Sequence, residues 1–107
     1  MQRKEPTRLQ VLISRLQQYV DSAVRNFRSG DDTQGMRYFL SAVEGLELVI
    51  REDRNSQQPK IDLNELLPSV RRLYFYMRNQ DIVGITDLLE DTVMPMTARW
   101  LKEGGGA

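Results

Sequence analysis

The sequence predicts an all-α protein, an antiparallel up-down-up-down four-helix bundle in which residues 1–107 form a single domain. Three observations predict this fold. Apolar residues recur at spacings of three and four in four segments, which is the pattern of helices that bury one face. Helix-capping and turn residues separate the segments, and no stretch has the alternation of a half-buried strand. The net charges of successive segments alternate in sign, which favours antiparallel neighbours.

The first helix is predicted over residues 7–28. It ends before Gly30, because glycine adopts at little steric cost the left-handed conformation that closes a helix. Its apolar stripe consists of Leu9, Leu12, Ile13, Leu16, Val20, Ala23, Val24 and Phe27.

The second helix begins after Asp31 or Asp32, either of which can cap its backbone N–H groups, and extends to about residue 53. Gly45 predicts that a neighbouring helix packs closely at this point. The stripe consists of Met36, Phe39, Leu40, Val43, Leu46 and Ile50, and it is widened by Tyr38, Ala42, Leu48 and Val49. A helix this apolar is either central or carries a second contact surface.

The third helix follows a polar loop over residues 54–60. Asp62 and Glu65 have the spacing of a capping box, which marks a helix start. Pro68 clashes with a regular helix, so either the first turn is distorted or the regular helix begins near Leu67. The helix is expected to end near Asn79.

The fourth helix is predicted to start at the cap Asp81, with Trp100 in its buried stripe. Pro95 should free the carbonyl group of Asp91 and bend the helix axis. The glycine-rich residues 103–107 are expected to form a frayed tail.

The composition excludes several classes of function. The chain has no histidine and no cysteine, which removes the commonest general base, the commonest zinc ligands, the thiol nucleophile and the disulfide. Fifteen basic and fifteen acidic residues give zero net charge, which argues against nucleic-acid binding. We find no glycine-rich phosphate loop, signal peptide or membrane-spanning stretch. We therefore expect a cytoplasmic protein that is not an enzyme, with no cofactor, no bound metal and no membrane partner.

The candidate partner-binding residues are large side chains that one core cannot accommodate. Residues 73–77 are all large and surround the helix, so Phe75 and Tyr76 should point away from the core. Met94 lies opposite the stripe of the fourth helix, and Tyr38 lies outside the main stripe of the second. Aromatic residues and methionine are enriched where proteins dock, so these four residues are predicted to bind a partner.

Carboxylates offer an alternative, a magnesium-dependent hydrolase. Glu44 and Glu47 lie three residues apart on the second helix, and Asp87 and Glu90 lie three apart on the fourth. These pairs resemble the all-α nucleotide pyrophosphatases, whose paired E-x-x-E and E-x-x-D motifs bind magnesium. In that family the motifs lie on successive helices, whereas here a whole helix intervenes. A solvated acidic face is the preferred interpretation.

A second resemblance concerns residues 73–100. Leu73, Tyr74, Tyr76 and Met77, followed by Asp81 and Trp100, resemble the C-terminal half of the flagellin export chaperones, the FliS family. The interval between these residues is shorter here than in that family, and Pro95 is not part of the family's pattern. Residues 87–95 also resemble small uncharacterised bacterial four-helix proteins. The resemblance implies a four-helix bundle with chaperone activity.

The leading hypothesis is therefore a non-catalytic protein-binding module, a chaperone or adaptor that takes an amphipathic segment of a partner protein. Its partner is another protein or a second copy of itself. The alternatives are a structural homodimer, whose surplus apolar surface is covered by its own copy, and the hydrolase built on Glu44, Glu47, Asp87 and Glu90.

Overall fold

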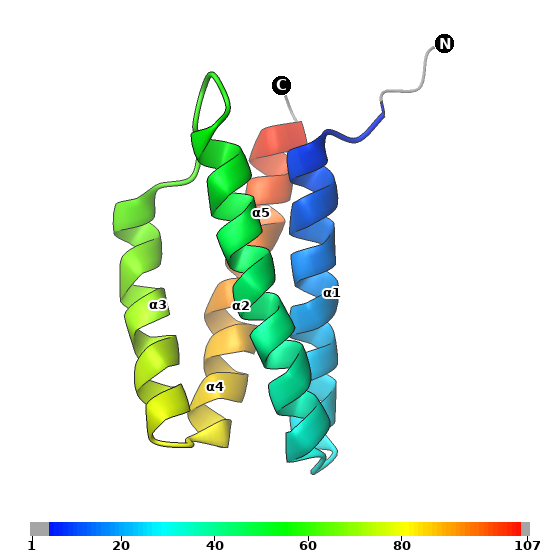
Figure 1. Cartoon of the computed structure of the whole chain (residues 1–107), viewed down its shortest axis with the longest axis vertical. Coiled ribbons are helices and arrows are strands. Elements are labelled where there is room, and N and C mark those ends of the chain that lie inside the picture. Colours follow the sequence, from blue (N-terminus) through cyan, green and yellow to red (C-terminus); the bar gives the residue numbers. More distant parts are fainter. Residues whose placement is uncertain (1–4, 106–107) are drawn as a thin grey trace.

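The computed structural model describes residues 5–105, and within them the chain forms four antiparallel helical rods (Figure 1). The first three rods are α1 (Arg8–Arg28), α2 (Asp32–Arg54) and α3 (Leu63–Arg78). The fourth is built from α4 (Ile82–Leu88), a π-helical turn η1 (Leu89–Val93) and α5 (Met94–Gly105). The predicted all-α bundle is confirmed. None of these helices is long and apolar enough to cross a membrane.

Most helix ends follow the predicted signals. Gly30 has a left-handed φ of 86° directly after α1, and the side chains of Asp31 and Asp81 cap α2 and α4. The start of α3 differs from the prediction. The side chain of Asp62 accepts from the backbone N–H of Asn64, and Glu65 instead pairs with Arg99 on α5, so the predicted capping box does not form.

Pro68 and Pro95 lie inside helical rods. The helix α3 starts at Leu63, ahead of Pro68, and the carbonyl group that this proline leaves without a donor belongs to exposed Asn64, where water can reach it. The interruption expected at Pro95 takes the form of the π-helical turn η1, in which the N–H of Met94 donates to the carbonyl of Leu89. This turn widens the helix directly before the residue that cannot donate.

A frayed tail is predicted over residues 103–107, and in the structure α5 continues as far as Gly105. The low helix propensity of glycine predicts the end of a helix only weakly, and the helical hydrogen bonds of α5 extend through the first glycines. Residues 106–107 lie outside the described residues.

The core lies between α1, α2 and the fourth rod. The predicted stripe of α1 is buried except for half-buried Leu9, and Trp100 on α5 is buried as expected. At the base of the bundle α1 and α2 come so close that a Cβ on Gly35 would overlap the ring of Phe27. At Gly45, by contrast, a Cβ would meet Leu16 at an ordinary van der Waals distance of 3.6 Å, so helix α1 packs there without requiring glycine.

The helix α3 stands apart from the rest of the bundle. The backbone of α1 packs extensively on α2 and on the fourth rod, whereas α3 makes extensive backbone contact only with α4. In Figure 1 this helix lies at one side of the molecule, away from α1. The backbones of α2 and α3 are therefore widely separated, and the two helices meet through their side chains. The candidate site lies in the space between them.

Candidate functional site

The candidate site is an apolar groove of about 330 Å³ between α2 and α3. Nine of its ten lining residues are apolar or aromatic, and the tenth is Glu47. The helix α2 contributes Phe39, Leu40, Val43, Leu46, Glu47 and Ile50, and α3 contributes Val70, Leu73, Tyr74 and Met77. Apolar concave surfaces of this size are typical of binding sites.

The groove exists because α2 carries two parallel stripes that are shifted by one residue. One stripe is buried in the core, and it consists of Gly35, Phe39, Ala42, Leu46, Val49 and Asp53. The other faces α3, and it consists of Leu40, Val43, Glu47 and Ile50. Since the backbone of α3 does not approach α2 closely, the second stripe is only partly covered.

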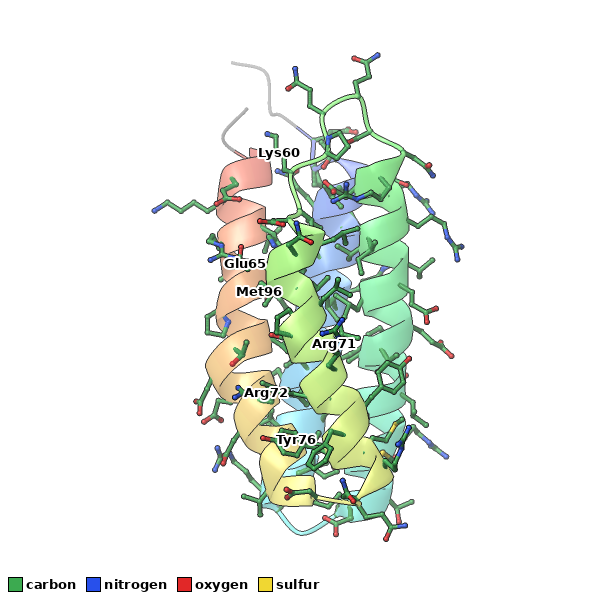
Figure 2. The ribbon with its side chains drawn as sticks, turned by 90° about the vertical axis from the view of Figure 1, so that its left-hand side faces the viewer. Lys60, Glu65, Arg71, Arg72, Tyr76 and Met96 are labelled. Atoms are coloured by element: carbon green, nitrogen blue, oxygen red, sulfur yellow. The ribbon has the colours of Figure 1, made fainter. Side chains whose placement is uncertain are left out.

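The two lips of the groove carry exposed apolar side chains. Leu40 on α2 is 49% exposed, and Tyr74 on α3 is 53% exposed. Arg71 lies at the edge of α3 that is nearer to α2, whereas Arg72 and Tyr76 lie at the edge nearer to α4 (Figure 2). Glu47 is thus the charged residue of the lining, and Arg71 is exposed on α3 outside the lining.

A buried carboxylate fixes the connection above the groove. Asp53, at the end of α2, is 1% exposed, and its two oxygens accept the backbone N–H groups of Lys60 and Ile61 at 2.9 and 3.1 Å. The guanidinium group of Arg54 donates to the carbonyl of Ile61 in the same loop. Because Ile61 directly precedes the cap of α3, these bonds determine where α3 begins relative to the end of α2.

A close contact fixes the other end of α3. The ring of Tyr76 lies over Gly84 on α4, where a Cβ would come within 2.6 Å of the ring. The ring of Phe75 meets that of Tyr76 edge to face, with 5.9 Å between the centroids. Tyr76 is consequently half-buried, and Phe75, at 64% exposed, is the predicted aromatic residue that projects into solvent.

The predicted partner-binding residues do not line the groove. Phe75 and Tyr76 are in contact with each other on α3. Tyr38 on α2 and Met94 at the start of α5 are half-buried, and the sulfur of Met94 lies 3.9 Å from the hydroxyl oxygen of Thr97. Their role in binding stays a prediction, and it concerns surfaces beside the groove rather than the groove itself.

The sequence contains a signal for the groove residues that the prediction did not use. The prediction places Leu40, Val43 and Ile50 in the same stripe as Phe39 and Leu46. Each of the three, however, directly follows a residue of the buried stripe, so it points about 100° away from that residue around the helix. Separating the two stripes would have indicated that α2 has two apolar faces. The exposure of Tyr74 could not be found in this way, because it depends on the distance of α3 from α2.

The four carboxylates of the hydrolase alternative are not brought together. Within residues 5–105 no group of three or more acidic residues lies close enough to hold a metal ion. Glu90 forms an ion pair with Arg28 on α1 at 2.8 Å, and Glu47 lines the groove. The hydrolase alternative therefore lacks the carboxylate cluster on which it depends.

Comparison with known proteins gives a family match that covers most of the chain. The family described as "Domain of unknown function (DUF8042)" matches residues 7–103. No curated protein and no solved structure matches the chain significantly. The resemblance to the flagellin export chaperones receives no support from these comparisons.

Proposed function

We propose that this chain, which belongs to the DUF8042 family, is a cytoplasmic protein-binding module that takes one amphipathic helix of a partner protein into the groove between α2 and α3. The observation that carries the proposal is the groove, whose lining is apolar except for Glu47. Helices that dock in such grooves place apolar residues at spacings of three and four into them. A chaperone or adaptor role follows from this mode of binding.

The positions of the exposed apolar side chains support the groove as the docking surface. Leu40 and Tyr74 stand on opposite lips, so a helix between them would contact both at once. Each exposes about half of its surface in the free protein, although nearby Phe39 and Leu73 are buried. Covering large apolar side chains stabilises a complex by roughly 25 cal/mol per Å² of apolar surface removed from water.

The test compares groove variants with a variant outside the groove. Tagged wild type, Leu40→Ser, Tyr74→Ser and Phe75→Ser are used as baits in an extract of the source cells, and each recovered protein is then bound to them in purified form. We expect a partner that wild type and Phe75→Ser retain and that both groove variants lose. Equal recovery by all four proteins would contradict the proposal. Loss in Phe75→Ser alone would instead favour the aromatic pair Phe75 and Tyr76 as the binding surface.

A second copy of the chain is the other candidate occupant. Leu40, Tyr74 and Phe75 are exposed on adjacent helices, and a two-fold contact through this face would cover them in both copies. Light scattering of the purified protein at low micromolar concentration distinguishes a homodimer from a module that binds another protein. A strict monomer contradicts the homodimer, whereas a dimer that Leu40→Ser converts to a monomer supports it.

A further inference from the structure

Glu47 is the charged residue in a lining that is otherwise apolar or aromatic. Within residues 5–105 its carboxylate takes part in none of the ion pairs. Arg51, one turn further along α2, makes no ion pair with it, although the spacing of four would allow one. Glu44, one turn earlier, is also exposed, but of these three charged residues only Glu47 lines the groove.

A helix that covers the groove removes water from this carboxylate. Desolvating an ionised group is unfavourable unless a partner of opposite charge or several hydrogen bonds replace the water. The residues that line the groove provide no such partner, because they are apolar apart from the hydroxyl group of Tyr74. In the part of the chain that the structure describes, neither Arg51 nor Arg71 forms an ion pair with Glu47, so we expect the replacement to come from the occupant.

We infer that the docked helix carries a lysine or arginine on the edge that faces α2, where its cation pairs with the carboxylate of Glu47; this inference rests on the proposed function. The charge differs in sign on the α3 side, because Arg71 is exposed there, outside the lining. A cation on that edge of the helix would meet a like charge. The groove consequently discriminates between partner helices by charge as well as by apolar pattern.

The dimensions of the groove limit the partner segment. Its lining on α2 extends from Phe39 to Ile50, eleven residue steps along the helix. At about 1.5 Å per residue this is about 17 Å, which corresponds to about three helical turns. The partner segment thus presents about three turns of apolar residues with the cation beside the turn nearest Ile50, since Glu47 lies three residues before Ile50.

The test uses three labelled synthetic helical peptides of one length with the same leucine face. At the positions that flank this face, the first peptide carries lysine, the second glutamine and the third glutamate. Fluorescence anisotropy at low salt gives the Kd for wild type, Glu47→Gln, Glu47→Lys and Val43→Glu. Asp91→Asn is the matched control, because it removes one exposed carboxylate on η1 outside the groove.

We expect wild type and Asp91→Asn to bind the lysine peptide about tenfold more tightly than the glutamine peptide. Glu47→Gln should lose most of this preference, Glu47→Lys should prefer the glutamate peptide, and Val43→Glu should weaken binding of all three. Equal binding of the three peptides to wild type, or a lysine preference that Glu47→Gln retains, would overturn the inference and leave groove binding intact. No binding of any peptide to wild type, or binding that Val43→Glu does not weaken, would contradict the proposed function itself.

Discussion

The carboxylate of Asp53 accepts the backbone N–H of Ile61 at 3.1 Å, and this hydrogen bond joins the end of α2 to the residue before the cap of α3. The other oxygen of Asp53 accepts the N–H of Lys60. The guanidinium group of Arg54 also donates to the carbonyl of Ile61, so three hydrogen bonds link the end of α2 to the loop that leads into α3. They fix the connection between the two helices that line the groove.

Replacing Asp53 by Asn should lower the free energy of unfolding by about 1–3 kcal/mol. Asparagine has one acceptor oxygen, so one of the two loop N–H groups that Asp53 accepts would face an NH₂ group instead. Urea denaturation measures the loss. Asp62→Asn is the matched control, because asparagine caps a helix about as well as aspartate and the residue is exposed. Equal stability of the two variants would contradict the role given to Asp53.

The two glycines of α2 should respond in opposite directions to alanine. Gly45→Ala is expected to stabilise the protein by up to about 1 kcal/mol, because alanine favours the helix and its Cβ fits beside Leu16. Gly35→Ala should destabilise it by about 1–3 kcal/mol, since its Cβ would overlap the ring of Phe27. Thermal unfolding of both variants checks this. A rise in Tm for Gly35→Ala would show that Phe27 moves aside without cost.

Adjacent residues of α2 should differ sharply in their effect on stability. Phe39 is fully buried, so Phe39→Ala is expected to cost about 3–5 kcal/mol. Leu40 lies on the lip of the groove and is half exposed, so Leu40→Ala should cost less than about 1.5 kcal/mol. Denaturant titration of the two variants gives both values. A large loss in Leu40→Ala would mean that this side chain belongs to the core and is not available to a partner.

The ion pair between Arg28 and Glu90 should contribute little and should depend on salt. Both side chains are about half exposed, and an exposed pair is typically worth about 0.2–1 kcal/mol. We expect Glu90→Gln to lower stability by less than about 1 kcal/mol at low salt, and the difference should vanish near 1 M salt, where screening is strong. A loss that persists at high salt would contradict this interpretation.

Much of the fold could be predicted from the sequence because its signals are local. Gly30 and Asp81 mark helix ends through the conformation and hydrogen bonding of single residues, and both act as predicted. Pro95 indicated an interruption, since it lacks an N–H, but it could not indicate a π-helical turn, which depends on how Leu89 and Val93 pack in the core.

The candidate site was harder to predict because it depends on the distance between two helices. Periodicity shows which side of α2 is apolar, but not that α3 stays away from Leu40 and Val43. Residue spacing also gives only an approximate direction for each side chain on a helix. From the spacing alone, Tyr74 is expected beside the core and Tyr76 in solvent. The structure gives the greater exposure to Tyr74, because the ring of Tyr76 packs over Gly84.

The central claim is that a helix docks between α2 and α3, and chemical-shift mapping tests it most directly. Unlabelled lysine peptide is added to ¹⁵N-labelled protein, and the shift of each backbone amide is followed. The account predicts the largest shifts along the groove, at Leu40, Val43 and Glu47 on α2 and at Val70 and Tyr74 on α3. Shifts concentrated on α1 or α5, or no shifts at all, would contradict it.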